Sequence, residues 1–310
     1  MRGRSVALVL SLALAVTTLA QVVAGQQNRP PRTADGRPDL NGVWSFATIT
    51  PFERPDVFAG KTTLTDEEVA AFEKQDEQRQ IAFMNTVGGG VGSYNREWYD
   101  WGRATNRSSL IVDPRDGKIP PLTAEARARA AARAEARRGR GPSDSWEDRS
   151  LAERCIVMSG PPMVPGAYNN NVQIFHTPDH VAFLNEMIHN ARIVPLDGRP
   201  HGGLRQWSGD SRGRWAGDTL IVDTVKFHSD TSFRGSSPDR HLIERFTRLD
   251  ARTMRYEFTF EDASTWTTPW TAQITMTRLP IQVYEYGCHE GNYGMANLLS
   301  AARAEENRRQ

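Results

Sequence analysis

The residues of this chain that could do chemistry gather in five short segments of its C-terminal half. Each segment lies between runs of β-branched and aromatic residues, where a strand is expected to end. Any one of them could be no more than a turn or a structural salt bridge. Together they place histidine, carboxylate, arginine and tryptophan at one boundary after another, so we expect one assembled polar site. The segments are 168–171, 186–192, 197–201, 207–215 and 285–293.

General acid–base catalysis requires side chains that carry a proton near neutral pH. His289 is the leading candidate because Cys288 precedes it and flanking glycines let the backbone turn into a pocket. The adjacent Glu290 could hold its charge state near neutrality. The alternative is a histidine that packs beneath a strand end and hydrogen-bonds a carbonyl. The candidate catalytic residues are His289, His189, Glu186 and Asp210.

Substrate binding is expected from fixed positive charges and flat apolar side chains. Arginine stabilises a developing oxyanion or a substrate carboxylate, and indole rings stack on sugars and aromatic groups. Trp266 and Trp270 are further flat walls of this kind. The candidate substrate-binding residues are Asn170, Arg192, Arg199, His201, Trp207, Arg212, Trp215 and Glu290.

Several familiar catalytic motifs do not fit. The GDS at 209–211 lacks the distant Asp-x-x-His of GDSL-type esterases, and HEGNY places Tyr293 where the second zincin histidine belongs. A three-ligand metal site from His189, His201 and His289 stays open, because it would form only in three dimensions. We expect metal-free acid–base chemistry that uses no cofactor.

The N-terminus is typical of a secretory signal peptide over 1–25, with two arginines before an apolar run. A polar, proline-rich leader follows over 26–38. No later run reaches the length of a membrane helix, so we expect a periplasmic or secreted protein with no membrane insertion after cleavage. The 38 basic and 37 acidic residues leave a net charge of +1, which excludes a nucleic-acid partner on charge grounds. The expected partner is a small-molecule ligand, and the oligomeric state stays open.

The chain has two cysteines, Cys155 and Cys288. Disulfides persist in oxidising compartments, so we expect a bridge between them. Such a bridge would tie the 285–293 segment to the stretch that precedes residue 168. The alternative is two separate buried thiols.

The elements divide into an N-terminal elaboration over 39–150 and a β core over 151–310. The elaboration is expected to contain an entry strand over 39–46, a helix over 65–83 with a capping box, a strand over 109–113 and a surface helix over 123–138. The core shows eight β-rich runs joined by turn residues, which indicates antiparallel neighbours. These runs span 172–176, 181–188, 192–196, 219–227, 242–249, 253–261, 272–278 and 282–286.

The expected fold is therefore mainly β: an antiparallel calycin- or lipocalin-like barrel, or a strongly curved sheet, with a part-helical N-terminal elaboration. Closure would remove exposed strand edges. An open sandwich is the competing architecture. The residues ahead of the 219–227 strand are expected to form one lip of a ligand pocket at the mouth of the barrel.

Five segments of the chain resemble a large family of exported bacterial proteins of unknown function. They are RSSLIVDPRDGKIPPLT, HNARIVPLDGRPH, WSGDSRGRWAGDTLIVDTVKF, PWT and EYGCHEGNY. Many members of that family have glutamate where this chain has Ala216, so the resemblance carries no role for a carboxylate at that position. It implies a single domain and adds no reaction.

Three functions compete on this sequence. The first is an exported hydrolase or lyase that acts on a polar ligand, sugar-like or carboxylated, through acid–base chemistry. The second is a non-catalytic carrier barrel that uses the same tryptophans. The third is a structural envelope module without a deep pocket. Several titratable groups within one pocket favour the first.

Overall fold

The computed structural model describes residues 30–87, 99–158 and 160–309. The expected signal peptide and the first residues of the leader lie outside these ranges. No helix in the described part of the chain is both long and apolar enough to cross a membrane.

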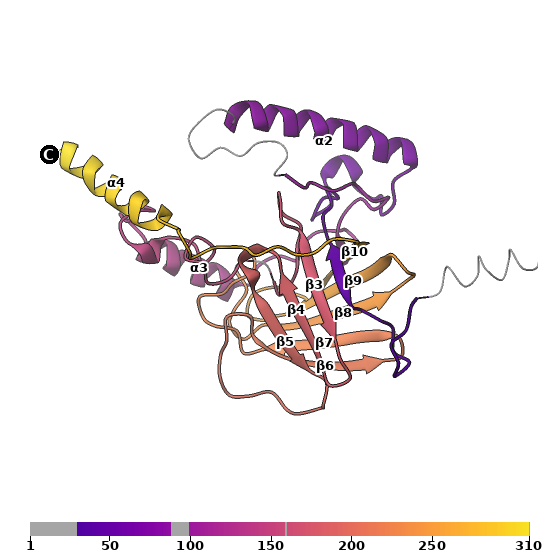
Figure 1. Ribbon diagram of the computed structural model, residues 1–310. Helices are drawn as coiled ribbons and strands as arrows, with labels where there is room; N and C mark the ends of the chain where they lie inside the picture. The colour runs from indigo at the N-terminus through magenta and orange to yellow at the C-terminus, as the bar shows by residue number, and fades with distance from the viewer. Residues whose placement is uncertain (1–29, 88–98, 159, 310) are drawn as a thin grey trace, which may run out of the picture.

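The protein is built on one antiparallel sheet of ten strands in the order β5-β4-β3-β1-β10-β9-β8-β7-β6, with β2 paired to β10 beside this path (Figure 1). Strands that follow one another in the sequence are usually adjacent in the sheet, as the short turn-rich connections predict. The strands are β1 (Gly42–Ser45), β2 (Ile111–Asp113), β3 (Asn171–His176), β4 (His180–Asn185), β5 (Ala191–Pro195), β6 (Asp210–Ala216), β7 (Thr219–Val225), β8 (His241–Arg248), β9 (Thr253–Glu261) and β10 (Trp270–Leu279).

The sheet is strongly curved but does not close into a barrel. Its two end strands, β5 and β6, approach each other without pairing. The approach is tight at Gly213, where an added Cβ would stand 2.9 Å from the Val194 side chain. Of the two expected architectures, the strongly curved sheet is therefore the one that forms.

Two of the sequence-based strand assignments are wrong at the ends of the sheet. Residues 282–286 form no strand and instead belong to an extended segment that follows β10. Conversely, the stretch expected to be a pocket lip is the strand β6, whose residue Asp210 pairs with Val225 of β7. The charged residues of β6 lie on its outward face, so the sequence of this strand resembles a polar loop.

Within the described ranges, three α-helices lie outside the sheet: α2 (Asp66–Val87), α3 (Ala124–Ala136) and α4 (Gly294–Arg309). The expected capping box begins α2, since the Glu68 N–H donates to Thr65 Oγ1 and the Thr65 N–H donates to Glu68 Oε2. Thr123 is the N-cap of α3, where its side-chain oxygen accepts from the Ala126 N–H. The sequence reasoning missed α4, which has no buried residue and no apolar stripe to reveal it.

The core fills the concave side of the sheet with aromatic side chains. Tyr256, Phe258 and Phe260 alternate inward along β9, as their period-2 spacing predicts. Trp266 and Trp270 pack edge-to-face against each other in the same core, with ring centroids 5.3 Å apart. Both tryptophans are therefore structural and form no wall of a ligand site.

The bridge between Cys155 and Cys288 is present, with the two Cα atoms 5.8 Å apart. It fastens the segment that follows β10 to the loop that precedes β3. In Figure 1 this yellow segment crosses the ends of β3, β4 and β5 before it reaches α4. The bridge therefore holds a piece of chain without regular structure against one end of the sheet.

Candidate functional site

A cavity of about 510 Å³ lies at that end of the sheet. Three parts of the chain form its walls: the turn before β3, the residue that follows β4, and the segment held by the disulfide. Its lining residues are Tyr168, Asn169, Glu186, Tyr284, Glu285, Tyr286, Gly287, Cys288 and Asn292. We call it the Glu186 cavity.

Strained backbone surrounds this cavity. Six non-glycine residues in the described ranges have positive φ, and three of them are Asn169 in its wall and the neighbouring pair Ile188 and His189. A β-branched residue such as Ile188, at φ 62°, pays a steric cost in this region. Such strain persists only where the surrounding structure imposes it, and it concentrates at functional sites. The tight turn between β4 and β5 fixes the direction of Glu186.

Glu186 is a half-buried carboxyl that forms no ion pair with a residue of the described structure. Its Oε2 accepts a hydrogen bond of 2.8 Å from the Asn171 side-chain amide. Burial raises the pKa of Glu186 above its ordinary value, and the nearby charge of Asp100 raises it further. The Asn171 hydrogen bonds and the neighbouring His189 offset only part of this effect. A carboxyl with a raised pKa is suited to give and take a proton.

His189 holds in place the part of the cavity wall that contains Tyr284. Its Nε2 lies 2.7 Å from the carbonyl oxygen of Tyr284, and because a carbonyl only accepts, the imidazole nitrogen donates. This bond joins the β4–β5 turn to the segment that follows β10. The sequence prediction made His189 a catalytic residue, whereas the geometry makes it a positioning residue for the tyrosine wall.

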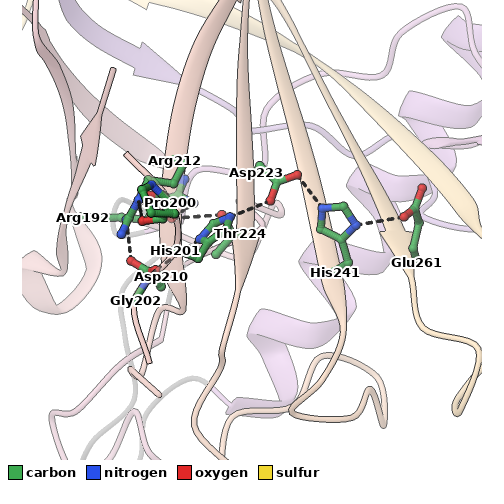
Figure 2. A network of polar contacts seen from close by, with 11 residues as sticks. Arg192, Pro200, His201, Gly202, Asp210, Arg212, Asp223, Thr224, His241 and Glu261 are labelled. Carbon is green, nitrogen blue, oxygen red and sulfur yellow. Dashed lines mark hydrogen bonds and ion pairs between the residues drawn. The ribbon is translucent and has the colours of Figure 1, made fainter. Parts of the chain in front are cut away.

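A second cluster of charged residues lies on the outer face of the sheet, and Figure 2 shows it as an extended row. Arg212 and Asp223 stand opposite each other on β6 and β7, and His241 stands opposite Glu261 on β8 and β9. The loop before β6 adds His201. We call this row, which consists of Arg212, Asp210, His201, Asp223, His241 and Glu261, the outer-face network.

Charges alternate along the outer-face network. Asp210 lies 2.6 Å from Arg212 and 3.2 Å from His201 Nδ1. The other ring nitrogen of His201 lies 2.9 Å from Asp223, which also contacts His241 at 2.5 Å. His241 has a carboxylate at each ring nitrogen, because its Nδ1 lies 2.9 Å from Glu261. An ionised carboxylate only accepts, so the His241 imidazole is satisfied as the imidazolium.

The pKa values of the network follow from this pairing. Burial alone would lower the pKa of His241, but the hydrogen bonds to Asp223 and Glu261 raise it above its ordinary value. Burial opposes ionisation of Asp210, yet the Gly202 N–H and Arg212 hold its pKa below the ordinary value. Asp210 is thus a fully paired structural anion that fastens the loop to β6, rather than a free proton carrier.

The structure separates the other predicted residues from the Glu186 cavity. Arg192 lies inside the curved sheet, where Nη2 is 3.1 Å from Glu244 Oε1. Tyr256 donates to the same carboxylate, at 2.8 Å. Exposed Arg199 pairs with Asp197 and helps to lower the pKa of that carboxyl to about 2. These arginines are therefore occupied by acids of the protein itself.

The predicted tryptophan and asparagine sites also have structural partners. Trp207 stacks on His228 with centroids 3.9 Å apart and lines a separate cavity of about 370 Å³. Trp215 packs against His176 at 5.3 Å. The Asn170 amide is buried and bonds to Gly166 and Asp100, so it builds the turn beneath Tyr168.

His289 is placed differently from its neighbour Cys288. It is exposed and lines a third cavity of about 310 Å³ with Trp146 and Arg154, while Cys288 lines the Glu186 cavity. The following Glu290 is exposed as well. His289 and Glu186 are therefore lining residues of different cavities, and the expected convergence of His289, His189, Glu186 and Asp210 on one cavity does not occur.

The sequence reasoning missed Asp223, His241, Glu261 and Glu244. The first three occupy outward positions of consecutive strands, so a register prediction would have aligned them. Glu244 gave no such signal, because it lies on the buried face of β8, where an apolar residue is expected. Tyr284 also escaped notice, one residue before the 285–293 segment.

The described residues contain no group of three or more histidine, cysteine or acidic side chains that could hold a metal ion. Comparison with protein-family models, with curated proteins and with solved structures gives no match.

Proposed function

We propose that this protein is an exported hydrolase or lyase that acts on a neutral, sugar-like ligand, with Glu186 as the proton-transferring group. The observation that carries the proposal is a desolvated carboxyl with a raised pKa, in no ion pair with a described residue, at the wall of a cavity with three tyrosines. Groups whose environment shifts the pKa in this way concentrate at functional sites.

The lining favours a neutral ligand over a carboxylated one. It contains two glutamates and two asparagines but no arginine, lysine or histidine. A substrate carboxylate would meet repulsion from Glu186 and Glu285, and the arginines once expected to receive it are paired elsewhere. Tyrosine faces combined with amides and carboxyls suit sugar rings, which present apolar faces and hydroxyl edges.

The raised pKa defines what Glu186 would do. In its protonated form the carboxyl donates to a departing oxygen, and in its ionised form it takes a proton from water or from the substrate. Glu285, also in the wall, is a second carboxyl of the kind that glycoside hydrolysis requires. His189 holds the Tyr284 backbone and so keeps the tyrosine wall in place.

Export is proposed on the N-terminal sequence. The disulfide between Cys155 and Cys288 is compatible with it, because such bridges persist outside the cytosol. Detection of the mature, shortened chain in the periplasm or medium would support this part of the proposal, and a full-length chain in the cytosol would contradict it.

The test is turnover of nitrophenyl glycosides and lactones by the wild-type protein and by Glu186→Gln. We expect the variant to lose about a hundredfold or more in kcat/KM, the usual contribution of a general acid or base. Glu257→Gln, which changes a carboxylate paired with Arg255 on β9, is the matched control and should retain full activity.

Two outcomes would overturn the proposal. Full turnover by Glu186→Gln would remove the carboxyl from the chemistry. Binding of panel members by the wild-type protein without any turnover would favour the alternative function, a non-catalytic carrier that uses the same tyrosine-lined cavity.

A further inference from the structure

A further cavity, of about 350 Å³, lies beside α2. The aromatic rings of Phe83 and Trp101 line it together with Ile49 and Pro165, and α2 contributes polar side chains. The polar lining residues are Thr48, Asp76, Arg79 and Gln80. We call it the α2 cavity. It takes no part in the chemistry proposed for Glu186.

A row of aromatic rings joins the α2 cavity to the Glu186 cavity. Trp101 stacks on Tyr99 with centroids 5.1 Å apart and planes 5° from parallel. Tyr99 in turn meets the ring of Tyr168 edge-on at 6.2 Å, and Tyr168 lines the Glu186 cavity. Phe83 contacts both Tyr99 and Trp101 at the α2 end.

The backbone fixes the spacing between the two cavities. Gly166 lines the α2 cavity and Asn169 lines the Glu186 cavity, so one short turn separates them. The buried Asn170 side chain accepts from the Gly166 N–H at 2.7 Å and donates to the Asp100 carbonyl at 2.8 Å. A ligand that filled both cavities would therefore meet two preformed sites at a constant separation.

The α2 cavity has the composition expected of a sugar subsite. A flat indole offers an apolar face, and the carboxylate, guanidinium, amide and hydroxyl around it can exchange hydrogen bonds with sugar hydroxyls. Gln80 donates to Asp76 at 2.7 Å, which orients both groups on successive turns of α2. Polar groups held by one another in this way need little reordering when a ligand binds.

We infer that the ligand of this protein is an oligosaccharide, whose reacting unit occupies the Glu186 cavity and whose distal units occupy the α2 cavity. The inference rests on the proposed function and extends it by naming chain length as a determinant of affinity. Trp101 is the distal stacking residue.

The experiment measures binding by calorimetry in the Glu186→Gln background, so that ligands are not consumed. The probes are cello-, malto- and chito-oligosaccharides from disaccharide to hexasaccharide. We expect affinity in one series to rise about tenfold with chain length, equivalent to about 1.4 kcal/mol. Adding Trp101→Ala should abolish this rise without weakening disaccharide binding, and Trp101→Tyr should restore part of it.

Two further variants guard against a folding artefact. Gln80→Ala changes only the polar side of the α2 cavity and should also reduce the rise with chain length. Trp146→Ala removes a tryptophan that is 52% exposed and lies outside both cavities, so it should change nothing.

Affinity that does not depend on chain length, a rise that survives Trp101→Ala, or no binding of any oligosaccharide would each contradict the inference. These outcomes differ from a failure of the proposed function. Suppose that turnover of simple glycosides depends on Glu186 but that affinity does not change with chain length. That result would support the proposed function and contradict only the inference of an oligosaccharide ligand.

Discussion

The Glu186 cavity and the outer-face network both gather acidic side chains, but they treat them in opposite ways. In the network, Asp210 and Asp223 each contact two cationic or potentially cationic groups. In the cavity, Glu186 receives a neutral amide and is half-buried. A paired charge is stabilised and fastens one element to another, whereas a desolvated charge without a counterion stays available to a ligand. The pairing therefore gives the network a structural role, and the chemistry proposed for this protein belongs to the Glu186 cavity.

The largest expected effect concerns the wall of the cavity. The Cys155–Cys288 bridge closes a loop with a sequence separation of 133 residues. The double substitution Cys155→Ser with Cys288→Ser should lower the free energy of unfolding by roughly 5 kcal/mol on the chain-entropy estimate. Urea unfolding of both proteins measures the difference. A loss below about 1 kcal/mol would show that the 284–292 segment is held by other contacts.

The next effect concerns the buried pair inside the sheet. Arg192→Met leaves Glu244, which is fully buried, without its cationic partner. We expect a loss of about 3–5 kcal/mol in the free energy of unfolding. The double variant with Glu244→Leu is the control, because replacing both charges by apolar groups restores much of that loss. Equal unfolding of single and double variants would contradict this account of Arg192.

Within the WSGDSRGRWAGDTLIVDT stretch, the structure reverses the ranking that the turn chemistry suggests. Asp218 looks like a turn residue whose loss costs stability, yet it pairs with Arg32 in an exposed contact. Asp210 is buried beside Arg212 and His201. Asp210→Ala should lose about 2 kcal/mol, the range for a hydrogen-bonded charge, whereas Asp218→Ala should melt close to the wild type. A larger effect at Asp218 would contradict the network's structural role.

A smaller effect concerns pH. His241 has a pKa raised above the ordinary value of about 6.5, so it contributes stability that is fully present below that value and is lost as the pH rises through the raised pKa. Between about pH 6 and pH 9, the wild type should lose more unfolding free energy than His241→Gln. His180→Gln is the control and should follow the wild type. Equal slopes of the unfolding free energy against pH in the wild type and His241→Gln would contradict the account of His241 as an imidazolium.

The period-2 patterns made the sheet predictable, and the Tyr256, Phe258 and Phe260 alternation is the clearest example. The strand β6 was missed because Asp210, Arg212 and Arg214 all face outward, which reads as a polar loop when no partner strand is known. The site was harder for a physical reason. Glu186 is distinguished by desolvation and by the lack of an ion pair with any described residue, and neither property exists until the chain is folded.

His289 illustrates the same limit. Its position after Cys288 made it the leading candidate, but the chain bends at residues 288–290. Cys288 therefore lines the Glu186 cavity while His289 lines another. Sequence proximity to a structural anchor pointed to a segment that does line the Glu186 cavity, but His289 itself is not among the lining residues.

The most direct test of the contrast is the free energy of unfolding of Glu186→Gln and Asp210→Asn, measured side by side at neutral pH. A carboxyl with a raised pKa in the folded state opposes folding when it is ionised, above its ordinary pKa, so Glu186→Gln should be as stable as the wild type or slightly more stable. Asp210→Asn loses a charge that its partners stabilise and should be about 2 kcal/mol less stable. Equal losses in the two variants would mean that Glu186 is as structural as Asp210, and would contradict the assignment of chemistry to the Glu186 cavity.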